Sequence, residues 1–196
     1  MKIRLVLIFV MAIALAAQPR YDLLLKGGYV IDPKNHVSRR QDVVIRDGKI
    51  ATITGAIPTV EARKVVNVRE LWITPGLVDI HAHVFAGENG GMLAGGTTSI
   101  FPDNFAFKAG VTTVVDAGSS GRRNYAQLKK NVIDRARTRV LVFLNILGAG
   151  MPGDNDEQDL NDMDAKASAA LAIANKETII GIKVDGMRRL ARLRQR

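Results

Sequence analysis

The chain has 196 residues, of which 47% are hydrophobic and 24% are charged, with a net charge of +9 and no cysteine. This length suits one domain, or one domain with a small accessory segment, and the hydrophobic content suffices for a buried core. Without cysteine there are no disulfides and no thiolate ligands, so nitrogen and oxygen must hold any metal. Lys2 and Arg4 contribute +2 and residues 185–196 contribute +4, which leaves +3 for the remainder. The body has no basic stripe interleaved with aromatic residues, so a nucleic-acid partner is not expected.

Residues 1–17 have the layout of a secretory signal peptide. Two basic residues precede thirteen apolar ones, and Ala14-Leu15-Ala16 offers a small-residue cleavage site. Thirteen residues are too few to cross a bilayer comfortably, so no stable membrane span is expected. A buried N-terminal strand or helix is the alternative. We expect export to the periplasm or the medium, with a mature chain that begins near Ala17 or Gln18.

Residues 18–74 read as short strands separated by turns. The expected strands are residues 21–25, 29–31, 42–45, 49–53 and 65–68, followed by 71–73. Gly27-Gly28 is expected to separate the first two strands. Asp47-Gly48 predicts a hairpin, because both central positions of such a turn need positive φ. His36 lies in a polar loop, residues 35–41, and is expected to face solvent rather than bind a metal.

Two histidines stand at the end of the next apolar strand, which follows the Pro75-Gly76 turn. Residues i and i+2 of a strand point to the same face, so the imidazoles of His81 and His83 converge on one side. Two imidazoles that face one point make half of a transition-metal site. From this spacing alone, the alternative is two unrelated polar residues where a strand leaves the core.

The surrounding sequence resembles a known family. Pro75 to His83 reads Pro-Gly-Leu-Val-Asp-Ile-His-Ala-His, Asp47 to Ile50 reads Asp-Gly-Lys-Ile, and Gly110 to Ser119 reads Gly-Val-Thr-Thr-Val-Val-Asp-Ala-Gly-Ser. These stretches resemble the amidohydrolase superfamily, metal-dependent hydrolases that include dihydroorotases and N-acyl-amino-acid deacetylases. The resemblance covers about residues 21–184. It implies an α/β fold in which a small β-sandwich segment (18–74) precedes the N-terminal half of a (β/α)8 TIM-type barrel (75–184).

The loop from Phe85 to Phe107 follows the His pair directly and carries five glycines. Loops of this length in compact domains are usually functional or disordered. Since active sites of β/α barrels lie at the carboxyl ends of the strands, this loop is expected to form a flap over the metal site. A mobile surface excursion is the alternative. In the deacetylase-like branch the segment that resembles Phe101-Pro102-Asp103 contributes to the substrate pocket.

Three more buried strands are expected, alternating with two helices. The expected strands are residues 112–116, 140–144 and 178–184. Ser119-Ser120-Gly121 is a candidate cap for the first helix. The second helix is expected from about Asp162 to Asn175. Its apolar face is expected to comprise Ala167, Ala170, Leu171 and Ala174. This alternation predicts parallel pairing, which gives four strands of a barrel in all. The acidic loop at 154–159 lacks the glycine and the terminal glutamate of a calcium loop, and is expected to be solvated.

Lys183 ends the fourth strand, within the otherwise apolar residues 179–184. A lysine directed into a barrel is costly unless its charge is lost or paired. The resemblance implies that this lysine reacts with carbon dioxide to form a carbamate. That carbamate bridges two divalent metal ions, expected to be zinc, about 3.5–4 Å apart. The alternative is a strand-end lysine whose amine reaches solvent.

The resemblance implies metal-assisted hydrolysis of amide (carbon–nitrogen) or acyl ester bonds in a small-molecule substrate. His81 and His83 would bind one ion, and Lys183 would bridge it to the second. In the family, histidines of strands five and six and a general-base aspartate of strand eight complete the site. This chain has three histidines, His36, His81 and His83. The further ligands, and a general base expected beyond Arg196, are therefore not among its residues.

Residues 185–196 carry five arginines and predict no fifth strand. A frameshift or a partial gene would produce such a tail, and the rival account is a genuine short protein with an arginine-rich end. Four strands alone leave two sheet edges open, so we expect a chain that aggregates or needs a partner, and that is inactive alone. The alternative to a hydrolase is a non-catalytic binding or interaction fragment on a half-barrel. Within the superfamily, a cyclic amidase such as a hydantoinase is a second alternative.

Overall fold

The computed structural model describes residues 19–85, 99–151 and 159–184. The chain divides into two compact units between Pro75 and Gly76. The predicted signal peptide and arginine-rich tail lie outside the described residues, as does most of the predicted flap and of the acidic loop. No helix in the described ranges has the length and apolarity needed to cross a membrane.

The first unit is a single five-stranded sheet with two short 3-10 turns. Its order is β3-β2-β1-β4, and β5 also pairs with β1. The strands are β1 (Tyr21–Asp32), β2 (Val37–Arg46), β3 (Lys49–Thr54), β4 (Ala62–Asn67) and β5 (Trp72–Ile73), and the turns are η1 (Pro33–Asn35) and η2 (Thr59–Glu61). β1 is antiparallel to β2 and parallel to β4 and β5. Tyr21, Leu24 and Val44 form its buried cluster.

The prediction that Gly27-Gly28 separates two strands is wrong, because β1 continues through both glycines. Leu25 pairs with Val43 and Gly28 pairs with Gln41, so two residues of β1 lie opposite Asp42 in a β-bulge. Gly27 takes φ +75° there and donates its N–H to Asp42 Oδ1 over 2.8 Å. Burial acts to raise the pKa of Asp42, but hydrogen bonds from the Lys26 amine and from backbone N–H groups outweigh it and lower that pKa.

The hairpin prediction at Asp47-Gly48 is confirmed. β2 and β3 pair antiparallel on either side of this turn, with Arg46 opposite Lys49. Asp47 has φ 51° and Gly48 has φ 70°, which is the positive-φ pair that the turn requires. His36 is exposed at the end of η1, as expected, although β2 begins at the next residue instead of after a longer polar loop.

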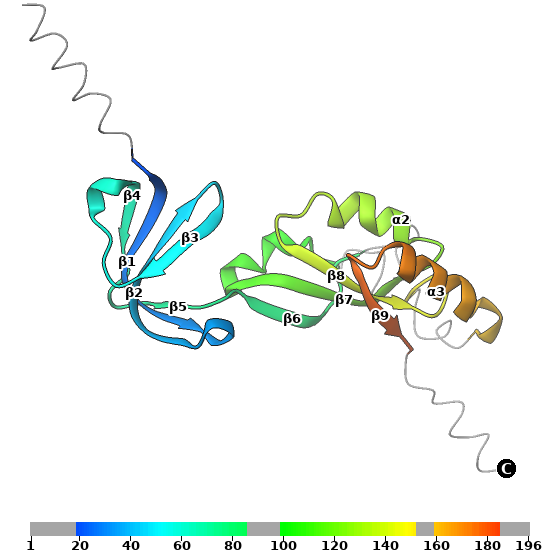
Figure 1. Ribbon diagram of the computed structural model, residues 1–196. Helices are drawn as coiled ribbons and strands as arrows, with labels where there is room; N and C mark the ends of the chain where they lie inside the picture. Colours follow the sequence, from blue (N-terminus) through cyan, green and yellow to red (C-terminus); the bar gives the residue numbers. More distant parts are fainter. Residues whose placement is uncertain (1–18, 86–98, 152–158, 185–196) are drawn as a thin grey trace, which may run out of the picture. The chain divides into compact units, whose positions relative to one another are not determined.

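The second unit is a mixed α/β structure around four parallel strands in the order β6-β7-β8-β9 (Figure 1). The strands are β6 (Leu77–Ala82), β7 (Val111–Gly121), β8 (Arg139–Asn145) and β9 (Ile179–Lys183), and the helices are α2 (Tyr125–Leu128) and α3 (Ala165–Ala174). Shorter turns are η3 (Pro102–Asn104), η4 (Phe107–Ala109) and η6 (Leu160–Asp162), and α2 continues as a π-helical turn, η5 (Lys129–Ile133). This confirms the predicted strand–helix alternation.

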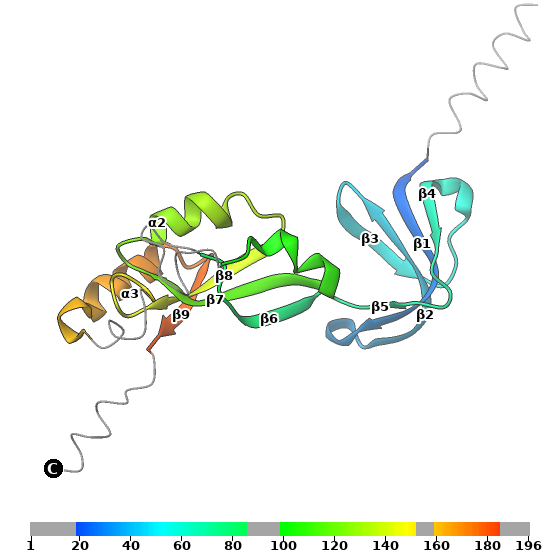
Figure 2. The same cartoon turned by 180° about the vertical axis from the view of Figure 1, so that it is seen from behind.

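Both helices pack on one face of this sheet, as the view from behind also indicates (Figure 2). The buried cluster there includes Val114, Val142 and Leu144 from the strands and Leu128 from α2, and Leu171 of α3 packs against it. Ala82 belongs to the same cluster. Because side chains alternate along a strand, its neighbour His81 faces the opposite side of the sheet.

Two local predictions in this unit are wrong, the second of them in part. Ser119-Ser120-Gly121 does not cap a helix, because β7 continues to Gly121 and α2 begins only at Tyr125, after Asn124. The predicted face of α3 is right for the half-buried Ala167 and Leu171 and wrong for Ala170 and Ala174, which are exposed. The buried Ser168 and the half-buried Ala172 face the sheet instead. A helix made largely of alanine has too weak a hydrophobic contrast to fix its rotation from sequence.

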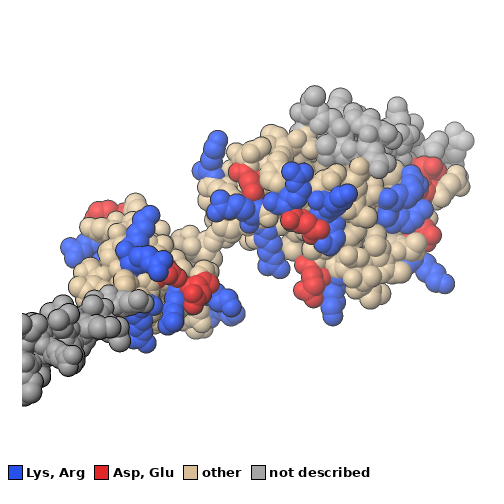
Figure 3. Space-filling model, turned by 90° about the horizontal axis from the view of Figure 1, so that it is seen from above, with Lys and Arg blue, Asp and Glu red and all other residues tan. Residues whose placement is uncertain are grey.

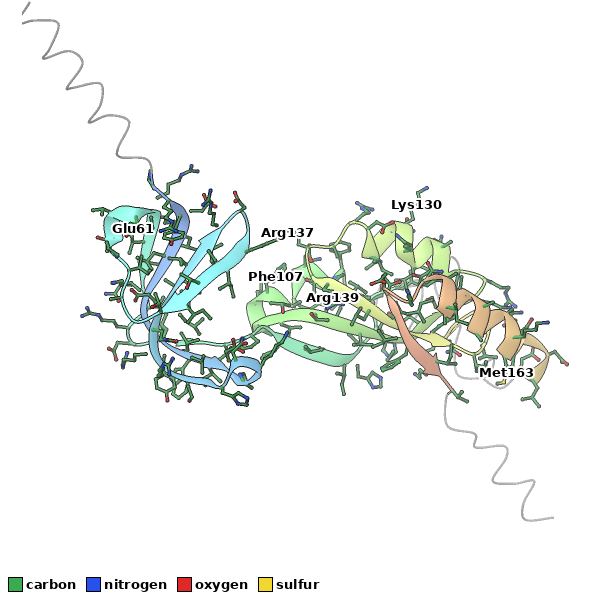
Figure 4. All side chains as sticks on the ribbon, in the orientation of Figure 1. Glu61, Phe107, Lys130, Arg137, Arg139 and Met163 are labelled. Atoms are coloured by element: carbon green, nitrogen blue, oxygen red, sulfur yellow. The ribbon has the colours of Figure 1, made fainter. Side chains whose placement is uncertain are left out.

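Asp103 lies at the amino end of β8. Its carboxylate accepts hydrogen bonds from the backbone N–H of Arg137 and of Thr138, with N–O distances of 2.9 and 2.8 Å for the shorter contacts. Arg137 lies 5.7 Å from the centroid of the Phe107 ring, and both are labelled in Figure 4. Asp103 therefore holds η3 to the segment that precedes β8. Since β/α barrels carry their active sites at the carboxyl ends of the strands, this position fits that structural role better than the expected role in the substrate pocket.

Acidic and basic side chains are interspersed on the face of the molecule seen in Figure 3. Asp162, for example, pairs with both Arg122 and Arg123. No single-sign stripe of the kind that tracks a phosphate backbone is visible on that face.

Candidate metal centre

The carboxyl ends of the four parallel strands gather the residues predicted from the sequence. His81 lies near the end of β6, and His83 follows that strand directly. Lys183 is the last residue of β9 and pairs with Asn145, the last residue of β8. Asn145 also pairs with Gly121, which ends β7. Parallel strands thus bring residues more than 100 positions apart in sequence to one edge of the sheet.

The two imidazoles lie side by side, as their i, i+2 spacing predicts. Their ring centroids are 5.4 Å apart and the rings are nearly perpendicular. His81 is exposed, and its backbone N–H donates to the Asp79 carboxylate over 3.0 Å. His83 is half-buried, and its Nδ1 lies 2.9 Å from Ser119 Oγ.

Sequence reasoning missed Asp116 and Ser119, which support the His pair from β7. Both are fully buried. Asp116 accepts hydrogen bonds from the Val84 N–H, over 3.0 Å, and from the Ser119 N–H, over 2.8 Å. Burial raises the pKa of the Asp116 carboxyl, although hydrogen bonds from Val84 and Ser119 act to lower it. An aspartate that interrupts an apolar strand, three residues before a serine, is the pattern that would have pointed to this pair.

The side chain of Lys183 lies against the β7 end. A methyl group built on Gly118 would come within 2.6 Å of Lys183 Cδ, so the lysine stem packs directly on that glycine. Gly118 has φ +89°, a conformation that glycine adopts readily. Lys183 Nζ lies 3.4 Å from the sulfur of the buried Met151. The Asn145 amide donates to the Gly118 carbonyl over 3.1 Å and so fixes the same segment.

Gly118 and Ser119, adjacent in the chain, therefore contact Lys183 and His83 respectively. Imidazole nitrogens suit a divalent transition metal, and the ring of His81 lies beside that of His83. Within the described ranges, no group of three or more His, Cys, Asp or Glu side chains gathers to hold a metal.

The chain is similar to known deacetylases and dihydroorotases. A deacetylase of Brucella anthropi is 32% identical over 153 residues, which cover 76% of this chain and 36% of that protein. A dihydroorotase of Anaeromyxobacter sp. (strain K) is 31% identical over 156 residues, which cover 78% and 35%. A crystal structure of a dihydroorotase matches with a TM-score of 0.69 at 30% identity, covering 84% of this chain and 42% of that one. No family model matches the sequence.

The chain spans about a third of the length of the curated relatives that it matches, which are named deacetylases and dihydroorotases. The structural match includes most of the described residues and places their mixed α/β arrangement within the fold of a dihydroorotase. With these likenesses over three quarters of its own length, the chain belongs to the amidohydrolase superfamily.

Proposed function

We propose that this chain carries part of the site of a metal-dependent hydrolase that cleaves amide or acyl ester bonds of small molecules. The observation that carries the proposal is that the rings of His81 and His83 lie side by side at the end of β6, that His83 contacts Ser119, and that the stem of Lys183 packs on the adjacent Gly118. Relatives named deacetylase and dihydroorotase support this class of reaction.

In this proposal His81 and His83 hold a divalent ion, expected to be zinc, through their imidazole nitrogens. A bound divalent ion polarises a carbonyl and makes hydroxide available near neutral pH. The chain's own residues position it: Ser119 fixes the His83 ring and Asp79 fixes the backbone at His81. Gly118 gives the Lys183 stem a surface without a side chain, which brings its amine to the same strand ends.

Lys183 is proposed to act as a carbamate bridge to a second ion. Its ammonium group would first lose one proton, and the neutral amine would then add to carbon dioxide and release a second proton, which converts a cationic side chain into an anionic pair of oxygens. This change supplies oxygen ligands that the described His, Cys, Asp and Glu residues do not gather in one place. Oxygen and nitrogen together suit zinc and several other divalent metals.

A second candidate function is non-catalytic binding, with the metal or the strand ends serving as a recognition site. It is favoured by the histidine count, because the third histidine of the chain, His36, lies in the first unit and is exposed. Further imidazole ligands of the kind that the family uses are thus not supplied by this chain.

The two candidates are separated by assaying the full chain, reconstituted with zinc and bicarbonate. The substrates are a panel of N-acetyl amino acids, an acetylated hydroxy acid and dihydroorotate. The hydrolase proposal expects zinc-dependent acetate release or ring opening. His83→Asn and Lys183→Met should lower it by about 100-fold or more, because the metal contributes several kcal/mol to transition-state stabilisation.

His36→Asn is the matched control and should leave turnover unchanged. Zinc binding that depends on His81 and His83 but gives no turnover with any member of the panel would favour the binding candidate. Turnover that persists in His83→Asn would contradict the proposed site.

A further inference from the structure

We propose that two copies of this chain associate through both open edges of the second unit, with β6 of each copy beside β9 of the other, and so close one barrel of eight parallel strands. The open edges are β6 and β9 because they are the two ends of the strand order β6-β7-β8-β9. The partner at each edge is thus a second copy of the same chain.

The described sheet of the second unit carries its helices on one side only. All three of its strand pairings are parallel. The helices α2 and α3, which connect β7 to β8 and β8 to β9, pack on the same face (Figure 2). Parallel sheets are covered either by helices on both faces or by closing into a barrel with an outer ring of helices, which has eight strands in β/α barrels. The four described strands are half of that number.

The face away from the helices is also apolar. Phe143 is the neighbour of Leu144, which belongs to the helix-side cluster, so Phe143 points to the opposite face. It pairs there with Ala117 of β7 and with Gly181 of β9. A Cβ on Gly181 would lie 2.9 Å from the Phe143 ring, so the ring occupies the space in front of that glycine. Both described helices lie on the other face, and the opposite wall of a closed barrel would cover this one.

The two edges present apolar side chains on the same side of the sheet. Ile80 of β6 lies two residues before Ala82 of the helix-side cluster, so it points to the helix side, where it is 70% exposed. Ile182 of β9 pairs with Leu144 of that cluster and is 40% exposed. Val78, also exposed, extends the row on β6. Placing β6 of one copy beside β9 of the other would bury these rows against each other and pair the open backbone groups of both edges.

A twofold axis along the barrel makes the two seams identical, so the same two edges are used twice and the assembly is closed. Pairing of β6 with β6 about a twofold axis would instead be antiparallel and would leave both β9 edges open. Closure is the arrangement that removes every edge of the sheet.

Closure would also bring more ligands to the candidate metal centre, and this part of the inference rests on the proposed function. All eight strands would run in one direction, so their carboxyl ends would form one rim. β9, which ends at Lys183, would lie beside the partner's β6, whose end carries the His81 and His83 pair. Two histidines and one lysine from each copy would place four histidines and two lysines on that rim. The second copy would thus supply imidazoles that one copy lacks there.

Cysteine cross-linking tests the seam directly, because the chain has no cysteine of its own. Ile80→Cys and Ile182→Cys are made in the full chain and treated with a short bis-maleimide, which tolerates an offset in strand register. We expect a cross-linked dimer when the two variants are mixed and none from either variant alone. Ile173→Cys, exposed on α3, is the control and should give no dimer with either variant. Dimer from Ile80→Cys alone, or no dimer from the mixture, would overturn the proposal.

A chain that carries both Ile80→Cys and Ile182→Cys distinguishes a closed pair from an open assembly. Closure predicts a cross-linked product that stops at the dimer. A ladder of trimers and larger species would mean that copies join head to tail without closing, which would overturn the barrel.

Charge pairing gives a second test that needs no reactive thiol. Ile80→Lys and Ile182→Glu should each be monomeric, because either change places an unpaired charge in both seams of a dimer. When the two variants are mixed, one seam keeps both isoleucines and the other pairs Lys with Glu. Light scattering should then show a dimer again. Ile182→Glu that stayed dimeric by itself would contradict the role given to the β9 edge.

Zinc titration tests the shared rim separately from the seam. The cross-linked dimer should bind zinc about 10-fold or more tightly than monomeric Ile80→Lys, since even groups that only support a ligand contribute about 10–100-fold to metal affinity. Equal affinities would overturn the shared rim. If neither sample bound zinc, the proposed function would fail, and the cross-links would still decide the seam.

Discussion

Gly118 is the residue at which the backbone of β7 meets the Lys183 side chain. Its φ of +89° disfavours any side chain, and a Cβ there would overlap Lys183 Cδ at 2.6 Å. Gly110 shares the positive φ, at +72°, but a Cβ there would meet only one methyl group, at 4.0 Å. The two glycines thus separate the cost of the backbone conformation from the cost of displacing the lysine.

Gly118→Ala should lower the free energy of unfolding by about 2 kcal/mol or more, because the strain of a positive φ adds to the overlap with Lys183. It should also weaken zinc binding. Gly110→Ala should cost about 1–2 kcal/mol from the backbone alone and leave zinc binding unchanged. Denaturant unfolding and zinc titration of both variants check this. Equal zinc affinity in the two variants would contradict the role given to Gly118.

The sequence alone predicts that the rings of His81 and His83 lie together, because side chains alternate between the two faces of a strand with a fixed period of two residues. Their ring centroids lie 5.4 Å apart, as two neighbours on one face should. Asp116 and Ser119 were missed because their hydrogen bonds with Val84 and His83 cross between strands more than 30 residues apart. Such pairs depend on the sheet register, which one sequence does not reveal.

At the scale of elements, the amino end of β8 depends on the Asp103 carboxylate of η3. It accepts hydrogen bonds from the N–H groups of Arg137 and Thr138 and from the Thr138 hydroxyl. Burial acts to raise the pKa of Asp103, but the hydrogen bonds from Arg137 and Thr138 outweigh it and hold that pKa below its usual value.

Asp103→Asn should therefore lower stability at pH 7 by about 1 kcal/mol, the usual worth of such hydrogen bonds. Because the carboxyl pKa is lower in the folded state, its contribution is present above the unfolded pKa of about 3.9 and is lost as the pH falls through the folded value. The difference between wild type and variant should accordingly shrink below about pH 4. Urea unfolding across pH 2.5–7, a range chosen around that value, measures it.

Asp134→Asn is the control for this experiment, since Asp134 forms an exposed ion pair with Lys129. Exposed pairs contribute little, so its effect on stability should be smaller than that of Asp103→Asn. If the difference in free energy of unfolding between wild type and Asp103→Asn grew as the pH fell below about 4, the lowered pKa assigned to Asp103 would be contradicted.

Element types were predictable where a pattern is strong, and boundaries were not. The Asp47-Gly48 hairpin needed only two residues of the right kind. Gly27-Gly28 predicted a break between two strands. The strand continues instead as a β-bulge, because the Asp42 carboxylate accepts a hydrogen bond from the Gly27 N–H. The rotation of α3 also could not be predicted, since Ala170 and Ala172 are chemically identical and only packing against the sheet distinguishes them.

At the scale of the whole molecule, the outer strands of the second unit expose apolar side chains. β6 and β9 are the ends of its four-stranded sheet. Leu77, Val78 and Ile80 are exposed on β6, and Ile180 and Ile182 are exposed on β9. Strand edges with exposed apolar residues favour association with another chain.

We expect the purified chain to self-associate, and Ile80→Lys to shift it toward the monomer, because a lysine on an edge strand opposes edge-to-edge pairing. Ile173→Lys is the control: Ile173 is 75% exposed, close to the 70% of Ile80, but lies on α3. Size-exclusion chromatography with light scattering measures the change. An equal shift in both variants would mean that general solubility, and not the β6 edge, governs association.

The claim that His81, His83 and Lys183 form one metal centre is tested most directly by zinc titration of the full chain in bicarbonate buffer. The account predicts that zinc binding is lost in His81→Asn and His83→Asn and is weakened in Lys183→Met. Binding should be unchanged in His36→Asn, because His36 belongs to the first unit. Zinc binding that survives both His81→Asn and His83→Asn, or that falls equally in His36→Asn, would contradict it.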